Sequence, residues 1–127
     1  MLKMLVFVAM GGALGAMGRY LTVAGVTALM GHGFPFGTLV VNVVGSFILG
    51  ALTETMTLSW SVSQEVRALL VVGMLGAFTT FSTFSLDVIL QIERGQIVPA
   101  VIYILSSVAL SVLALFAGLR LMRVVLT

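Results

Sequence analysis

The chain has 127 residues, of which 61% are apolar and only 8% are charged. Soluble domains contain roughly 45 to 50% apolar and about 25% charged residues, so this chain has too few charges to cover a surface that faces water. The composition excludes a soluble enzyme domain and indicates a protein whose solvent is lipid. Cysteine is absent and there is one histidine, which argues against thiolate chemistry and a histidine-rich metal site. The net charge of +2 is scattered and forms no patch for nucleic acid.

Four apolar stretches of membrane-spanning length occupy residues 4–29, 36–58, 66–90 and 99–126. The links between them are short, and short links force neighbouring helices to pack up and down. The sequence therefore predicts an all-α membrane protein with a single four-helix transmembrane domain over residues 1–127. Lys3 followed by an apolar run resembles a signal peptide, but the length of the run and the three further stretches favour an uncleaved first helix.

Basic residues bear on orientation, because Lys and Arg in short loops favour the cytoplasmic side. With four spans, both termini lie on the same side as the second link. Four basic residues fall on this side and two on the other: Lys3, Arg67, Arg120 and Arg123 against Arg19 and Arg94. The bias is weak. A fixed orientation with cytoplasmic termini and insertion in both orientations, with antiparallel pairing, therefore both remain open.

Two stretches carry polar residues at every fourth position, which places each set in one stripe along a helix. The stripes are Thr38, Asn42 and Ser46 in the second stretch, and Tyr103, Ser107 and Ser111 in the fourth. Polar groups inside a membrane usually face a partner or a water path. Two interpretations are open: a shared polar path, or hydrogen bonds that only hold helices together or satisfy their own helix backbone.

The third stretch is unusual between residues 73 and 85, where two glycines precede five hydroxyl residues and three phenylalanines. Hydroxyl and β-branched residues compete with helical backbone hydrogen bonds, so we expect a helix break near mid-membrane. Carbonyl groups freed at such a break can bind a cation. Phe78, Phe81 and Phe84 either pack in the core or turn their positively polarised ring edges towards an anion.

The first stretch contains Gly11 and Gly15, which form a face of small residues for close helix approach. Arg19 lies well inside the same stretch, where it either attracts anions into a vestibule or snorkels to fix the depth of the helix. Glu54 and Asp87 fall at the ends of stretches, and we expect them at the boundary with water.

Residues 11–20, 37–47 and 76–85 resemble the corresponding blocks of the small bacterial fluoride channels called Fluc or CrcB. The third block, GAFTTFSTFS, is highly specific, and the length and four-span layout match over the whole chain. Asp87 is a departure, because members of this family more often have Glu there.

The resemblance implies a dual-topology antiparallel homodimer in the bacterial inner membrane, surrounded by lipid, with two separate fluoride pores. It also implies a sodium ion buried at the dimer centre and a channel, rather than an enzyme, that exports fluoride by passive electrodiffusion and protects the cell from fluoride toxicity. The residues that it implies for the fluoride pathway are Phe81, Phe84, Asn42, Thr38, Ser82, Tyr103, Ser107 and Ser111. Arg19 would lie at the vestibule, and the backbone carbonyls of Gly76 and Thr79 would hold sodium, a hard cation that prefers oxygen ligands.

Two other functions are compatible with a short four-span chain. A proton-coupled small multidrug exporter needs a carboxylate in mid-membrane, and the first stretch contains no Asp or Glu. In a non-transporting structural subunit, the polar stripes would serve only to hold helices together.

Overall fold

The computed structural model describes residues 1–127 and is entirely helical. Four helical segments are long and apolar enough to cross a membrane, and the third of them, Gln64–Glu93, is made of four shorter pieces. In chain order the elements are α1 (Leu2–Met30), α2 (Phe36–Leu58), α3 (Gln64–Arg67), η1 (Ala68–Leu75), α4 (Gly76–Phe78), α5 (Ser82–Glu93) and α6 (Ile97–Leu126). The fold class predicted from composition and hydropathy is confirmed.

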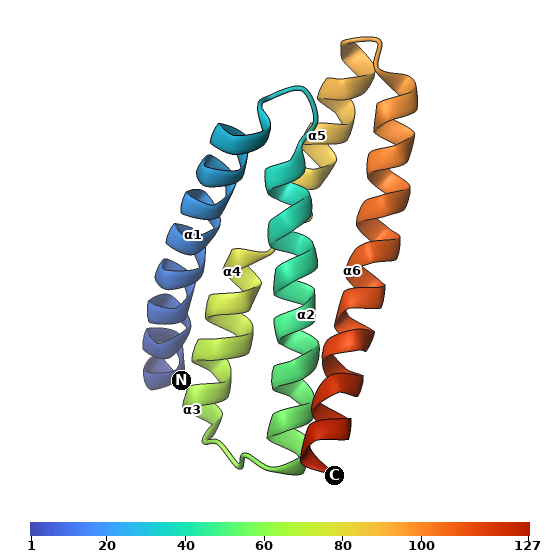
Figure 1. Cartoon of the computed structure of the whole chain (residues 1–127). Helices are drawn as coiled ribbons and strands as arrows, with labels where there is room; N and C mark the ends of the chain where they lie inside the picture. Colours follow the sequence, from blue (N-terminus) through green and yellow to red (C-terminus); the bar gives the residue numbers. More distant parts are fainter.

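The helices run up and down, so the chain has two distinct ends (Figure 1). Both termini lie at the same end as the link between α2 and α3, as the count of spans predicts. The loop between α1 and α2 and the turn between α5 and α6 form the opposite end. We call this opposite end the loop end.

The third spanning segment is broken in its middle, as expected. Helix α4 ends at Phe78, Thr79 has extended backbone angles (φ −84°, ψ 159°), and α5 begins at Ser82. The Thr79 hydroxyl donates a 2.9 Å hydrogen bond to the Leu75 carbonyl, and the Thr80 hydroxyl accepts a 3.1 Å bond from the N–H of Thr83. After the break, the Thr80 hydroxyl takes the place of a backbone acceptor for the Thr83 N–H, as in a helix N-cap. Before the break, the Thr79 hydroxyl adds a second hydrogen bond to the Leu75 carbonyl, which also accepts the Thr79 N–H at 3.1 Å.

Before the break, η1 forms a π-helix, which the sequence pattern did not predict. Its backbone packs directly on the small-residue face of α1. A Cβ atom at Gly11 would collide with the Leu69 carbonyl, and one at Gly15 with the Met74 carbonyl. The predicted close approach at these two glycines is confirmed, and its partner is the wide, irregular turn of η1.

Helices α2 and α6 pack along most of their length (Figure 1). Glycine again permits the approach, because a Cβ at Gly50 would meet the Leu115 carbonyl and one at Gly118 the Phe47 carbonyl. Val41 of α2 and Tyr103 of α6 are the largest fully buried side chains. This helix pair is the rigid support on which the polar stripes are held.

Candidate functional site

The two polar stripes meet at a cavity beside the helix break. This cavity, which we call the inner cavity, has a volume of about 310 Å³ and lies between α2, the break and α6. Asn42 and Ser46 line it from α2, and Ser107 and Ser111 line it from α6. The Ser107 hydroxyl is buried without a hydrogen-bond partner. Since an unpartnered hydroxyl is costly, the cavity is suited to a polar occupant.

Asn42 binds the backbone at the break. Its Nδ2 donates a 3.0 Å hydrogen bond to the Thr80 carbonyl, and its Oδ1 accepts a 2.8 Å bond from the Thr80 N–H. Irregular backbone at membrane depth needs such partners, because there is no water to supply them. The expectation that this side chain holds helices together is confirmed. Its position in the wall of the inner cavity also leaves the predicted pathway role open.

The phenylalanines of the third segment differ in their surroundings. The ring of Phe78 packs against Gly18 and Gly45, so it belongs to the core. Phe81 and Phe84 line the inner cavity, with ring centroids 5.6 Å apart. Phe84 is buried, whereas Phe81 is 77% exposed in the single chain. Phe81 and Phe84, which are predicted for the pathway, therefore line the inner cavity, whereas Phe78 does not.

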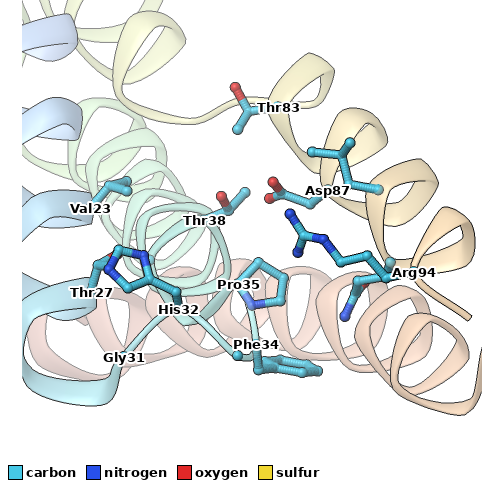
Figure 2. A pocket seen from close by; sticks show the side chains of 14 residues that line it. Val23, Thr27, Gly31, His32, Phe34, Pro35, Thr38, Thr83, Asp87 and Arg94 are labelled. Carbon is cyan, nitrogen blue, oxygen red and sulfur yellow. The ribbon is translucent and has the colours of Figure 1, made fainter. Parts of the chain in front are cut away.

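A second cavity of about 290 Å³ lies nearer the loop end and is shown in Figure 2. We call it the mouth cavity. Thr38 lines it one helical turn before Asn42, and Asp87 lines it from α5. The Tyr103 hydroxyl donates a 2.9 Å hydrogen bond to Asp87 Oδ2, and the Tyr103 ring lies 5.1 Å from that of Phe84. Tyr103 and Asp87 thus stand between the two cavities.

The remaining predicted site residues lie around the break. Arg19 Nε donates a 3.1 Å hydrogen bond to the Ala77 carbonyl, and Arg19 lines a separate cavity of about 390 Å³ with Thr83. Ser82 is exposed outside the inner cavity, 3.4 Å from the Thr80 hydroxyl oxygen.

The carbonyls of Gly76 and Thr79 lie at the break itself. Neither carbonyl oxygen accepts a hydrogen bond from a turn, a helix cap or a side chain. In an uninterrupted helix the Thr80 N–H would bond to the Gly76 carbonyl, but here it is taken by Asn42. Two free carbonyl oxygens are ligands that suit a hard cation.

The structure adds a partner for one of the acidic residues. Glu54, near the end of α2, is buried, with its Oε2 2.9 Å from Arg123 Nη2. The sequence signal was available, because a carboxylate inside an apolar helix needs a partner and Arg123 falls near the same membrane surface. The link between Asp87 and Tyr103 was also missed, since 16 positions separate them.

Sequence reasoning also overlooked three residues of the mouth cavity. His32, Gln91 and Arg94 come from different elements and look like ordinary polar residues of loops and helix ends. Nothing in their spacing indicates that they meet.

Four apolar helices with polar residues gathered at cavities between them define a multi-pass membrane protein of the channel or transporter class. The family described as CrcB-like protein, Camphor Resistance (CrcB), matches residues 6–119. Three relatives carry the name Fluoride-specific ion channel FluC. That of Chelativorans sp. (strain BNC1) is 54% identical over 122 residues, with 96% of this chain and 98% of the relative covered.

The relative from Rhizobium etli is 53% identical over 116 residues, covering 91% of this chain and 93% of its own length. That from Rhodospirillum centenum is 51% identical over 122 residues, covering 96% and 97%. The chain therefore belongs to the CrcB family.

Proposed function

We propose that this protein is a fluoride channel of the bacterial inner membrane, through which fluoride leaves the cell by passive electrodiffusion before it reaches toxic levels. The observation that carries the proposal is the inner cavity, in which Phe81 and Phe84 face hydroxyl and amide groups and no charged side chain is present. The names of the relatives support fluoride as the ion. The protein then acts as a channel and not as an enzyme.

The chemistry of the inner cavity suits a small anion that must lose its water. Selective passage requires that the protein replace the hydration shell at close range. The hydroxyls of Ser107 and Ser111 can donate hydrogen bonds to the ion, and the edges of the Phe81 and Phe84 rings carry partial positive charge. Since none of these groups has a full positive charge, the ion is stabilised without being trapped.

The two cavities follow one another along the same helices, which supports a continuous pathway. Thr38 in the mouth cavity and Asn42 in the inner cavity are successive turns of α2. Tyr103 and Ser107 are likewise successive turns of α6, and Tyr103 reaches Asp87 in the mouth cavity. Ser82 stands beside the Thr80 hydroxyl at the break, where it extends the row of hydroxyls. The membrane potential then drives the anion outwards, at about 2.3 kcal/mol per charge per 100 mV.

Arg19 has two roles in this proposal. Its hydrogen bond to the Ala77 carbonyl ties α1 to the break. Its positive charge, adjacent to Thr83 at the rim of the mouth cavity, attracts anions towards the vestibule.

A second copy of the chain completes the site. A single chain leaves Phe81 77% exposed at the edge of the inner cavity, together with the hydroxyl-bearing residues Ser82 and Ser85. Polar groups that face lipid are costly, so a protein surface has to cover them. The weak charge bias permits insertion in both orientations, and we therefore propose an antiparallel homodimer with one pathway along each protomer.

The free carbonyls of Gly76 and Thr79 would hold a structural sodium ion between the two protomers. Gly76 is exposed in the single chain, so its carbonyl is available to an ion shared with a second copy. The bound ion would supply positive charge that holds the two breaks together. Asn42 contributes by keeping the Thr80 N–H away from the Gly76 carbonyl.

Proteoliposomes that contain the purified protein and internal potassium fluoride test the function. Fluoride efflux, followed with a fluoride electrode, should begin only when a potassium ionophore balances the charge. Chloride efflux under the same conditions should be much slower. A proton-coupled exporter would instead show efflux that depends on a proton gradient, and a structural subunit would show none. Absent fluoride efflux, or equally fast chloride efflux, would refute the proposal.

A further inference from the structure

The mouth cavity contains a group of polar side chains that the proposed pathway does not use. It is lined by residues from the end of α1, the loop that follows, the start of α2 and the second half of α5. Besides Thr38 and Asp87, its polar side chains include Thr27, His32, Gln91 and Arg94. Figure 2 shows Thr27, His32, Asp87 and Arg94 of this group around the cavity.

Gln91 is the most unusual of them. It is only 2% exposed, yet neither its Nε2 nor its Oε1 has a hydrogen-bond partner. The Oε1 of Gln96, in the turn that follows α5, is also buried and unpartnered. Unsatisfied polar atoms of this kind cost about 1 to 3 kcal/mol each, so buried amides almost always have a partner. Gln91 lines the mouth cavity, so a small polar species there would supply the hydrogen bonds that Gln91 lacks.

The charges at this site favour an anion. The guanidinium of Arg94 points into the cavity in the direction of Asp87 (Figure 2), but the ion pairs of the structure are elsewhere, at Lys3 with Glu65 and Arg123 with Glu54. Asp87 accepts its hydrogen bond from Tyr103. Arg94 is therefore a cation without an ion-pair partner, and it lines the mouth cavity together with Asp87.

The same cavity also offers acceptors, at Gln91 Oε1 and the Asp87 carboxylate. A bare anion cannot use acceptors, whereas the water molecules around an anion can donate to them. The mix of donors and acceptors therefore fits an ion that keeps part of its hydration shell. In the inner cavity, by contrast, phenylalanine rings and valine side chains form part of the wall and offer water no hydrogen bonds.

We propose that Arg94 and Gln91 form an anion-holding site in the mouth cavity, where hydrated fluoride is captured before it loses water in the inner cavity. The choice of fluoride as the captured ion rests on the proposed function. The site controls capture, while the phenylalanines control passage. Because the ion remains hydrated there, the site does not discriminate by ionic size, and bromide also binds to it.

Concentration-dependent flux tests the capture role. For Arg94→Gln, the efflux rate at low fluoride should fall roughly tenfold, the scale of one hydrogen bond to a charged group, and approach the wild-type rate at high fluoride. Gln91→Met should show the same pattern in weaker form. Arg67→Gln is the matched control, because it removes the same charge from a residue that does not line the mouth cavity and should behave as wild type. Equal loss at all concentrations, or no loss at low fluoride, would overturn the proposal.

Bromide supplies a readout that does not depend on transport. Crystals of the wild type soaked in sodium bromide should show an anomalous peak within hydrogen-bond reach of Arg94, and crystals of Arg94→Gln should not. If the peak is present but fluoride is not transported, the anion site stands and the proposed function fails. If transport is present but the peak is missing or survives in Arg94→Gln, the anion site fails and the proposed function stands.

Discussion

The side-chain amide of Asn42 pairs in both directions with the backbone of Thr80, at 3.0 Å for the donated bond and 2.8 Å for the accepted one. A single residue of α2 thereby satisfies both backbone polar groups of Thr80, the residue that the helix break exposes. The same contact withdraws the Thr80 N–H from the Gly76 carbonyl, which it would reach in a continuous helix. The helix break and the free Gly76 carbonyl therefore both result from the pairing of Asn42 with Thr80.

Replacement of Asn42 by Leu should destabilise the protein, because the carbonyl of Thr80 loses its partner and the N–H of Thr80 can regain one only at the Gly76 carbonyl. A buried group left unsatisfied costs about 1 to 3 kcal/mol, so the loss should be at least of that size. Chemical or thermal unfolding of the purified protein in detergent measures it. Ser46→Ala is the control. Ser46 lines the same cavity but makes no hydrogen bond, so its removal should leave stability within about 0.5 kcal/mol of the wild type. Equal stability of the Asn42→Leu and Ser46→Ala proteins would contradict this account.

Phe81→Ile should lower fluoride flux without loss of folding. Phe81 is largely exposed in the single chain, so it contributes little to the packing of its own protomer, while its ring edge lines the inner cavity. Phe84→Ile should lower flux and also some stability, since Phe84 is buried against Tyr103. Flux in proteoliposomes and elution volume in size exclusion separate the two effects.

Phe116→Ile, at an exposed position of α6 outside the inner cavity, should leave flux unchanged. Wild-type flux in both the Phe81 and Phe84 variants would rule out the ring-edge mechanism.

Gly50→Ala should destabilise the contact between α2 and α6. The added Cβ would meet the Leu115 backbone, which has no flexible end that can move aside. Overpacking of this kind costs about 1 to 3 kcal/mol. Gly25→Ala is the matched control, because a Cβ there has no atom within 4 Å. The melting temperature in detergent should fall for the first variant only, and a similar melting temperature for both would show that α2 and α6 can separate without cost.

Hydropathy and polar spacing predict the four helices and much of the inner cavity. Asn42 and Ser107 each lie on a stripe of one helix, and a stripe can be recognised from residues four positions apart. The break near Thr79 is predictable for the same reason, because the competing hydroxyl groups are neighbours in sequence.

Other features depend on contacts between distant segments. Asn42 and Thr80 are 38 positions apart, and nothing in either residue indicates that the amide of one serves the backbone of the other. That Gln91, Arg94 and His32 line one cavity is likewise set by where the end of α5 meets the loop after α1. The π-helix of η1 follows from the backbone contact at Gly11 and Gly15, which needs the position of α1. Periodicity describes one helix at a time and contains no information on such pairs.

Removal of sodium should weaken the dimer, because the free carbonyls of Gly76 and Thr79 would lose their ligand. We expect a lower melting temperature, and more monomer in size exclusion, when sodium chloride is replaced by choline chloride at equal ionic strength. Asn42→Leu should reduce this dependence on sodium, since the freed Thr80 N–H can return to the Gly76 carbonyl. Ser46→Ala should keep it. Anomalous or competition data that show no ion at the centre of an intact wild-type dimer would remove sodium from the mechanism. A sodium dependence that persists unchanged in Asn42→Leu would remove the role of Asn42 in exposing the carbonyl.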